Sequence, residues 1–238
     1  MVNQKKNFYV SLLITHAALA ASLETPPCAP ARHITNCSTL TLEKVDNLAT
    51  MKNAIKNYRA SGAWRKSNEC LVKKAKKVLS TYIPVGDKKL AVIFDIDDTL
   101  LSTWDINIIN DFGYIRDVNH AWEMEGKAPA IEPMLDLFNF LKTGGFTLFA
   151  ITGREEYQRA ATIKNLYKVG FRGWKELFFK PAEYVGLPAC VYKSKFRGQI
   201  AAQGYTIIAS FGDQFSDASG TNQAIHNFKL SNPMYLVP

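Results

Sequence analysis

Hydrophobic positions along the chain recur with two different spacings, and the spacing changes near residue 85. From Leu42 to Tyr82, apolar residues return every three or four positions, which is the pattern of amphipathic helices. The pair Ser61-Gly62 interrupts this pattern, so we expect one helix before it and a second helix over about Ala63–Tyr82. We therefore predict a helical N-terminal region that ends near residue 82.

Beyond this region, apolar residues stand in short continuous runs, which are typical of strands buried on both faces. The runs are Leu90–Phe94, Phe146–Ile151, Ala189–Tyr192 and Tyr205–Phe211. Helical patterns lie between them, at about residues 135–141 and 160–167, and a third follows at about 195–203. Strands that alternate with helices form parallel sheets. We therefore predict an α/β fold with a three-layer, Rossmann-like parallel sheet that has helices on both faces. A small cap insertion, at about residues 102–130, is expected after the first strand, and a helical extension before it.

Each predicted strand ends in polar residues that are capable of chemistry. Asp95 and Asp97 follow the first run, and Thr152-Gly153-Arg154 follows the second. Lys193 follows the third run, and Gly212-Asp213 ends the fourth. Ligands of open parallel sheets bind outside the carboxyl ends of the strands, so we expect these residues to meet in one site.

The N-terminus has the features of a signal peptide. Lys5 and Lys6 precede the mostly apolar segment Phe8–Ala20, which is too short to span a bilayer comfortably. Small residues at Ala18 and Ala20 match the pattern that signal peptidase cleaves, so we expect cleavage near Ala20 and a secreted or periplasmic protein. No later stretch is long and apolar enough to predict a stable membrane anchor. The expected organisation is a signal peptide at 1–20, a linker and helical region at 21–84, and one domain at 85–238.

All four cysteines follow the expected cleavage point, at Cys28, Cys37, Cys70 and Cys190. An even number of cysteines in an exported chain favours two disulfides. Three pairings are possible and the sequence does not choose among them; the working hypothesis is Cys28–Cys37 with Cys70–Cys190. The alternative for Cys190, which lies in an apolar run, is a buried free thiol. The cysteine spacings do not resemble a zinc site.

The formal net charge is +8, and removal of Lys5 and Lys6 leaves +6 (8 minus 2). A basic surface attracts anionic substrates. The densest basic cluster, at residues 73–77, lies on an amphipathic helical pattern, which is typical of a solvated helix face. We therefore expect small anionic partners and no nucleic-acid polymer. The oligomeric state is left open by the sequence.

Two carboxylates in the stretch Asp95-Ile96-Asp97 carry the strongest chemical signal. Residues i and i+2 of an extended strand end face the same side, so the two carboxylates point together. At about 4 Å and an effective dielectric near 20, their repulsion is roughly 4 kcal/mol, so they require a cation or a shared proton. A calcium loop of the EF-hand type would need Gly and Glu where this chain has Leu100 and Ile106. The D-x-D-D pattern also resembles a motif of terpene cyclases, but those are large helical proteins, and a predicted strand precedes this stretch.

Four segments, in order, resemble the four motifs of the haloacid-dehalogenase superfamily. They are Phe94–Leu100 (motif one, DxDx[TV]), Ile151–Arg154 (motif two), Tyr192–Lys195 (motif three) and Phe211–Asp217 (motif four, GDxxxD). Together with Trp122 and Ala128-Pro129-Ala130, they resemble more narrowly the acid phosphatase branch, class B or subfamily IIIB, which includes the plant vegetative storage proteins. The resemblance covers about residues 88–238.

The resemblance implies a chemical role for each matching residue. Asp95 is the expected nucleophile, and Asp97 is the expected general acid and base. Thr152 and the Gly153 N–H are expected to hold phosphate oxygens, and Lys193 to balance the negative charge of the substrate.

A metal ion, Mg²⁺, is also implied by the resemblance. Its expected ligands are the Asp95 carboxylate, the Asp97 backbone carbonyl and Asp213, because oxygen ligands completed by water suit this ion. Asp217 is expected to lie behind them and to orient the metal-bound water.

Several assignments leave alternatives. Asp98 is expected to point away from the site by strand alternation. Lys195 and Arg197 compete with Lys193 for the motif-three role, and Lys193 is preferred because it directly follows the apolar run. Arg154 is either a substrate contact or a structural ion pair.

The function implied by the resemblance is a Mg²⁺-dependent acid phosphatase that hydrolyses small phosphate monoesters through an aspartyl-phosphate, with nucleotides among the candidate substrates. Two other functions stay open. One is a non-catalytic storage or binding protein on the same fold, and the other is a phosphotransferase with an alcohol as acceptor. The nucleophile position is sometimes replaced in storage members of the branch, and here it is Asp95, which favours the enzyme.

Overall fold

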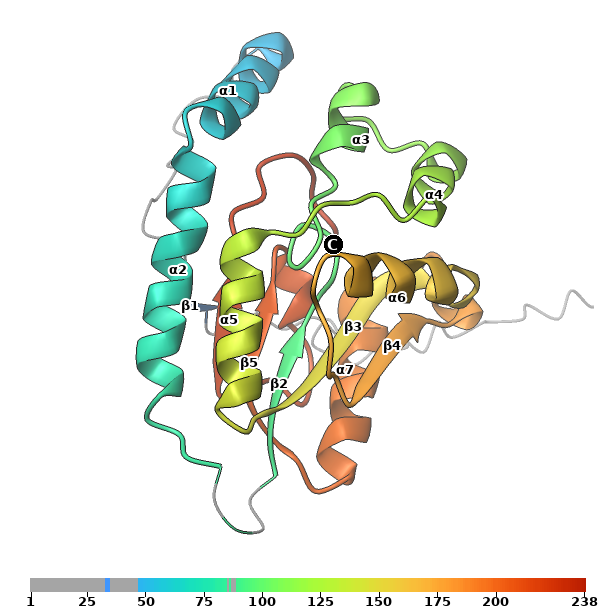
Figure 1. The fold of residues 1–238 in the computed structure, drawn as a ribbon. Coiled ribbons are helices and arrows are strands. Elements are labelled where there is room, and N and C mark those ends of the chain that lie inside the picture. Colours follow the sequence, from blue (N-terminus) through green and yellow to red (C-terminus); the bar gives the residue numbers. More distant parts are fainter. Residues whose placement is uncertain (1–32, 35–46, 85, 87–88) are drawn as a thin grey trace, which may run out of the picture.

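The computed structural model describes residues 33–34, 47–84, 86 and 89–238 (Figure 1). The expected signal peptide, at 1–20, and two of the four cysteines, Cys28 and Cys37, lie outside the described residues. The described chain forms a parallel β-sheet between layers of α-helices. The predicted fold class is therefore confirmed.

Six described strands form the sheet, and every strand pairing is parallel. The strands are β1 (His33–Ile34), β2 (Leu90–Phe94), β3 (Thr147–Glu155), β4 (Glu176–Lys180), β5 (Thr206–Gly212) and β6 (His226–Lys229). Their order across the sheet is β1-β6-β5-β2-β3-β4. From β2 the sheet extends one way through β3 and β4 and the other way through β5 and β6. A ligand site is expected beside such a reversal, at the carboxyl ends of the strands.

Seven α-helices lie in the described residues. They are α1 (Leu48–Ala60), α2 (Ala63–Leu79), α3 (Trp104–Ile109), α4 (Arg116–Met124), α5 (Glu132–Thr143), α6 (Arg159–Lys168) and α7 (Ala189–Ala202). Helices α2, α5 and α6 pack on one face of the sheet and α7 on the other. Helices α3 and α4 lie beyond the end of the sheet toward which the strand arrows point (Figure 1). Among these helices, none combines the length and the hydropathy needed to cross a bilayer.

Alternation along the strands explains the two helical layers. In β2, Val92 and Phe94 belong to the hydrophobic cluster under α2 and α5, whereas Ala91 and Ile93 belong to the cluster under α7. Successive side chains of a strand point to opposite faces, so a strand that is apolar at every position must be covered twice. The continuous apolar runs of the sequence therefore predicted the layers correctly.

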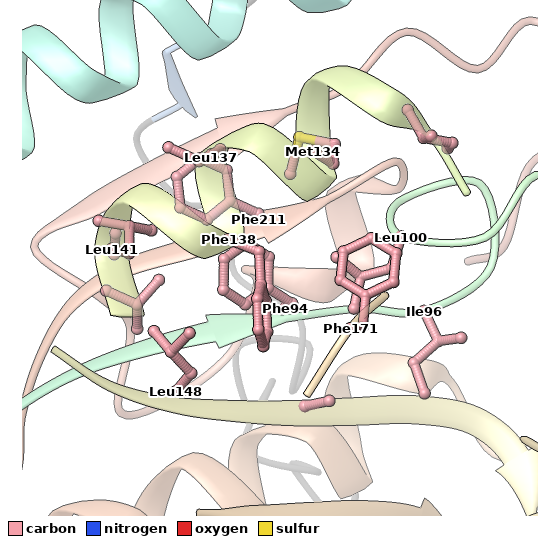
Figure 2. Packing of buried hydrophobic residues seen from close by; sticks show 14 of the residues in the cluster. Phe94, Ile96, Leu100, Met134, Leu137, Phe138, Leu141, Leu148, Phe171 and Phe211 are labelled. Atoms are coloured by element: carbon pink, nitrogen blue, oxygen red, sulfur yellow. The ribbon is translucent and has the colours of Figure 1, made fainter. Parts of the chain in front are cut away.

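Aromatic stacking joins the two central strands directly below the polar strand ends. The Phe94 ring stacks on Phe211 with 5.1 Å between ring centroids, and Phe138 of α5 packs on Phe94 at 5.6 Å (Figure 2). The Asp95 N–H also donates to the Phe211 carbonyl at 2.8 Å. The residues that precede Asp95 and Gly212 are thus fixed relative to each other by the core.

One predicted strand is wrong. Ala189–Tyr192 forms the first turn of α7, not a strand. A run of four apolar residues fits either element, and Pro188 directly precedes the helix, where it removes no intrahelical hydrogen bond. The strands that the prediction missed are β1, β4 and β6. Lys193 therefore reaches the carboxyl edge of the sheet from a helix.

The predicted break between two N-terminal helices is confirmed. Helix α1 ends at Ala60 and α2 begins at Ala63, with Gly62 between them in the left-handed region at φ +76°. This conformation suits glycine because it carries no Cβ. Helix α1 has no buried residue, whereas α2 contributes Leu71, Ala75 and Leu79 to the core. The fold thus includes α2 in the same packed layer as α5.

The expected pairing of Cys70 with Cys190 is wrong. Cys70 lies in α2 and Cys190 in α7, and the sheet separates these helices. A disulfide requires its two Cα atoms to lie within about 7 Å. Neither cysteine is a free thiol, which also removes the buried-thiol alternative for Cys190.

Phe138→Ala should destabilise the fold strongly, because Phe138 is fully buried and its ring packs on Phe94, Phe171 and Trp174. We expect a loss of about 3–5 kcal/mol in the free energy of unfolding, measured by urea denaturation. The control is Phe140→Ala on the same helix, where the side chain is 37% exposed and the loss should stay below about 1 kcal/mol. Equal losses in the two variants would contradict the assignment of the buried face of α5.

Candidate active site

Three buried carboxylates meet at the carboxyl edge of the sheet. Asp95 follows β2, Asp213 follows β5, and Asp217 ends the short 3-10 helix η3 (Phe215–Asp217). One oxygen atom of each carboxylate lies within 4.8 Å of the other two. The three residues are 8%, 2% and 7% exposed, so water screens their charges poorly. The ends of β2 and β5 therefore bring acidic residues together as the sequence predicted.

Lys193 enters this cluster from α7. Its Nζ donates to Asp95 Oδ1 at 2.7 Å and to Asp217 Oδ1. Burial acts to lower the pKa of this ammonium, but the charges of Asp217 and Asp95 outweigh burial and hold the pKa well above its ordinary value. Lys193 is therefore charged across the physiological pH range, and it connects Asp95, the candidate nucleophile, to Asp217 of motif four.

The cluster carries more negative than positive charge. Among the described residues, Lys193 is the one ammonium that forms hydrogen bonds to this cluster, and it contacts Asp95 and Asp217. Burial raises the pKa of Asp95 to about 7; the charge of Lys193 opposes this shift, and the charge of Asp217 adds to it. Burial also raises the pKa of Asp213 well above its ordinary value, and Asp217 and Asp95 add to this effect. With all three carboxylates ionised, Lys193 leaves two negative charges, which a divalent cation would neutralise.

The oxygen atoms in the cluster fit such a cation. Within the described residues, no donor contacts Asp95 Oδ2 or Asp213 Oδ1. Both oxygens of Asp217 are occupied, one by Lys193 and the other by the Gln214 N–H at 2.8 Å. An all-oxygen donor set is what Mg²⁺ prefers, and the free oxygens belong to Asp95 and Asp213.

Gly212 permits the close approach of Asp217. A Cβ atom at position 212 would lie 2.0 Å from Asp217 Oδ2 and 2.4 Å from its Cγ. Any side chain at this position would displace the Asp217 carboxylate from Lys193 and from the Gln214 N–H. The Gly212-Asp213 pair thus provides both an acidic group and the space for a second one.

Asp97 lies beside the cluster and is held by Arg154. The guanidinium makes two parallel hydrogen bonds, from Nε to Asp97 Oδ2 at 2.9 Å and from Nη2 to Asp97 Oδ1 at 2.6 Å. Its third nitrogen, Nη1, donates to Thr162 Oγ1 at 3.0 Å. The Arg154 side chain is 1% exposed, whereas that of Asp97 is 23% exposed. Arg154 therefore forms an ion pair that orients a partly accessible carboxylate.

Thr152 and Gly153 reach the same edge of the sheet from β3. Phe94 pairs with Ala150 in the register of β2 and β3, so Thr152 lies next to the start of the Asp95–Asp97 loop. Thr152 is fully buried, and its Oγ1 accepts a hydrogen bond from the Arg154 N–H at 3.1 Å. Gly153 is exposed, and a Cβ placed on it would lie 3.3 Å from the Tyr192 hydroxyl. Gly153 is therefore accessible and lies next to a polar hydroxyl group.

Three nearby charged residues do not join the cluster. Asp98 accepts hydrogen bonds from the Thr103 N–H at 3.0 Å and from the Tyr235 hydroxyl at 2.7 Å, and it lies in the left-handed region at φ +51°. Its hydrogen bonds go to Thr103 and Tyr235 and not to the cluster, and the left-handed loop conformation, not strand alternation, sets its orientation. Lys195 lies at the surface, 3.9 Å from Glu183. Arg197 is buried and donates to backbone carbonyls, including that of Asp217 at 2.7 Å.

Two parts of the site gave no signal in the sequence. The C-terminal segment 231–238 contributes Asn232, whose Nδ2 donates to Asp213 Oδ2 at 2.6 Å, and Tyr235. Helix α4 contributes Glu123, whose Oε2 accepts a hydrogen bond from Gln158. These residues lie outside the four motifs, and no periodic pattern distinguishes them from other polar residues.

Glu123 makes the stability of the protein depend on pH. Burial raises the pKa of Glu123 to about 7, the charge of Asp97 adds to the effect, and Arg154 opposes it. Because the folded-state pKa of Glu123 is above the ordinary value of 4.5, the folded protein favours the neutral carboxyl. The protonated Glu123 therefore stabilises the fold fully below about pH 4.5, and this contribution is lost as the pH rises through about 7.

Glu123→Gln should therefore stabilise the protein more at pH 8 than at pH 5, since the amide keeps the acceptor for Gln158 without the charge. One pKa unit corresponds to about 1.4 kcal/mol, and after allowance for partial exposure we expect a difference of about 1–2 kcal/mol between the two pH values. Urea denaturation at both pH values measures it. Glu125→Gln, at an exposed position just beyond the same helix, is the control and should show no such difference. A pH-independent effect of Glu123→Gln would show that the Glu123 carboxyl does not titrate in this range.

Comparisons with known proteins agree with this geometry. Acid phosphatase 1 of Solanum lycopersicum is 34% identical over 164 residues, which cover 65% of this chain and 62% of that protein. The stem 31 kDa glycoprotein of Glycine max is 36% identical over 151 residues, which cover 61% of this chain and 59% of that protein. Vegetative storage protein 1 of Arabidopsis thaliana is 35% identical over 152 residues, 61% of this chain and 55% of that protein. The chain thus spans about three fifths of the length of these relatives.

A solved structure with the same fold is the class C acid phosphatase from Bacillus anthracis, with a TM-score of 0.65 and 20% identity. The superposition covers 79% of this chain and 86% of that one. A family model described as HAD superfamily, subfamily IIIB (acid phosphatase), matches residues 16–238, almost the whole chain. The resemblance inferred from the four motifs is therefore confirmed, and the chain belongs to subfamily IIIB, the acid phosphatases, of the HAD superfamily.

Proposed function

We propose that this protein is a Mg²⁺-dependent acid phosphatase that hydrolyses small phosphate monoesters through an aspartyl-phosphate on Asp95. The observation that carries the proposal is the buried cluster in which Lys193 connects Asp95 to Asp217, with a free oxygen on Asp95 and another on Asp213. A phosphate ester brings further negative charge, so a site of this composition requires a cation beside Lys193. Nucleotides and sugar phosphates are both within the proposed substrate class.

In the first half-reaction, a carboxylate oxygen of Asp95 attacks phosphorus, and the bond from phosphorus to the ester oxygen breaks. Asp97 gives a proton to the departing alkoxide, so that a neutral alcohol leaves. In the second half-reaction, Asp97 takes a proton from water, and the water oxygen attacks phosphorus to release inorganic phosphate and the free Asp95 carboxylate. Asp97 enters the first half-reaction as the neutral carboxyl and returns to that form in the second, and Arg154 keeps its side chain in place.

The remaining residues bind and position the transferring phosphoryl group. Thr152 Oγ1 and the Gly153 N–H would hold its oxygens, and the Lys193 ammonium would offset its charge. Mg²⁺ would be held by the Asp95 carboxylate, the Asp97 carbonyl and Asp213, with Asp217 behind them, and it would stabilise charge that develops on the phosphoryl oxygens. Positioning and electrostatics of this kind supply most of the catalysis in phosphoryl transfer.

Asp95→Asn should reduce phosphate release from a panel of monoesters by at least about a thousandfold, because an amide is not a nucleophile. Thermal unfolding should be unchanged or occur at a slightly higher temperature, because the substitution removes a buried charge. Asp117→Asn, at a side chain that is 92% exposed, is the control and should keep full activity.

Chelation with EDTA should inactivate the wild-type protein, and added Mg²⁺ should restore its activity.

Retention of more than a few per cent of activity in Asp95→Asn would rule out the covalent route. A wild-type protein that releases no phosphate from any ester in the presence of Mg²⁺ would instead favour a storage or binding role. Phosphate release that falls below substrate loss when alcohols are added would identify a phosphotransferase.

We further propose that the chain is exported and that it carries two disulfides. The support is the signal-peptide pattern of residues 1–20 together with the absence of a free thiol at Cys70 and Cys190. The mass of the mature protein should therefore correspond to cleavage near Ala20, and alkylation under non-reducing conditions should modify no cysteine. Intact mass spectrometry with and without reductant measures both. Four alkylated cysteines, or an uncleaved N-terminus, would contradict export into an oxidising compartment.

A further inference from the structure

The C-terminal segment 231–238 crosses the carboxyl edge of the sheet and contacts several parts of the site. Asn232 Nδ2 donates to Asp213 Oδ2 at 2.6 Å, and the Tyr235 hydroxyl donates to Asp98 Oδ2 at 2.7 Å. Farther along, the Val237 N–H donates to Gln214 Oε1 at 3.0 Å. The segment therefore ties the loop after β2 to the loop after β5.

Asn232 and Gln214 both act on one oxygen of Asp213. Gln214 Nε2 and Asn232 Nδ2 each lie 2.6 Å from Asp213 Oδ2, and no described donor contacts Oδ1. A carboxylate with one oxygen held by two amides cannot rotate to exchange its oxygens without losing both hydrogen bonds. The two amides thus select Oδ1 as the atom presented to the carboxylate cluster.

The position of Asn232 is in turn fixed by the corner between α1 and α2. Trp64 Nε1 donates to the carbonyl of Ser231 at 3.0 Å, and the Tyr58 hydroxyl donates to Ser231 Oγ at 3.2 Å. The Arg59 guanidinium lies 3.6 Å from the centroid of the Trp64 ring and also donates to Ser102 Oγ at 3.1 Å. The residue directly before Asn232 is therefore clamped by two side chains from the N-terminal helices.

We propose that this corner and Asn232 form a chain of positioning residues that holds Asp213 in the orientation required for the divalent cation. The inference rests on the metal site of the proposed function. It gives the N-terminal helices, which lie outside the four motifs, a specific task. Trp64 fixes Ser231, Ser231 carries Asn232, and Asn232 orients Asp213. Partners that orient a metal ligand in this way contribute about 10–100-fold to metal affinity.

A purely structural role of the segment makes different predictions from a positioning role. Loss of a structural contact lowers the unfolding temperature and weakens the binding of both the metal and the ester. Loss of a positioning contact weakens binding of the metal alone and leaves the KM for the ester unchanged once Mg²⁺ is saturating. Direct titration of the protein with Mg²⁺ in the absence of substrate therefore separates the two roles.

The test is isothermal titration of the full-length mature protein with Mg²⁺, together with steady-state assays at saturating Mg²⁺. Asn232→Ala should raise the Kd for Mg²⁺ about 10–100-fold, with the ester KM within about twofold of the wild-type value. Trp64→Phe, which removes the donor to Ser231 and keeps an aromatic ring, should raise the Kd by a smaller factor, about threefold to tenfold. The controls are Asn53→Ala, at an exposed position of α1, and Trp174→Phe, which alters a partly buried indole that packs on Phe138 of α5; neither should change the Kd.

A folded Asn232→Ala protein with an unchanged Kd for Mg²⁺ would overturn the inference while leaving the proposed function intact. An increase in Kd of the same size in Trp174→Phe and Trp64→Phe would also overturn it, since the effect would then reflect general destabilisation. If the wild-type protein itself binds no Mg²⁺, the metal site of the proposed function fails and the inference fails with it.

Discussion

The repulsion among three buried carboxylates is the constraint on which the rest of this site depends. Asp95, Asp213 and Asp217 each have a carboxylate oxygen within 4.8 Å of the other two, and among the described residues only Lys193 forms an ion pair with this cluster. Two unit charges 4 Å apart repel each other by roughly 4 kcal/mol at an effective dielectric near 20. Burial raises the pKa values of Asp95 and Asp213, and the repulsion between the carboxylates adds to this effect. A cation and a phosphoryl group are the components that would make such an arrangement favourable.

The fold holds this unfavourable cluster in place through its packing. The stacked rings of Phe94 and Phe211 lock the two central strands together one residue before the acidic loops begin. The missing side chain of Gly212 lets Asp217 approach the backbone, and buried Arg197 donates a hydrogen bond to the carbonyl of Asp217. Each acidic group therefore sits on a rigid support, which is what a site that works by positioning needs.

The layers, the sheet and the acidic strand ends could be predicted because they follow from local patterns. Continuous apolar runs indicate strands buried on both faces, and the polar residues at the carboxyl ends of β2, β3 and β5 must then share one edge. The helix that carries Lys193 could not be distinguished from a strand, because four apolar residues suit both elements. The Asn232–Asp213 contact joins polar residues 19 positions apart, and only the folded path of the C-terminal segment brings them together. Contacts of this kind have no periodicity, so sequence patterns do not reveal them.

Charge also bears on the choice between an enzyme and a storage protein. Destabilising groups persist in proteins mainly where function requires them. A protein that serves only for storage gains nothing from three buried carboxylates, and replacing the nucleophile with a neutral residue would relieve part of their repulsion. This chain keeps Asp95, together with the lysine that binds it and the arginine that orients Asp97. The full charged set is costly to fold and useful only for chemistry, which favours the catalytic interpretation over the storage one.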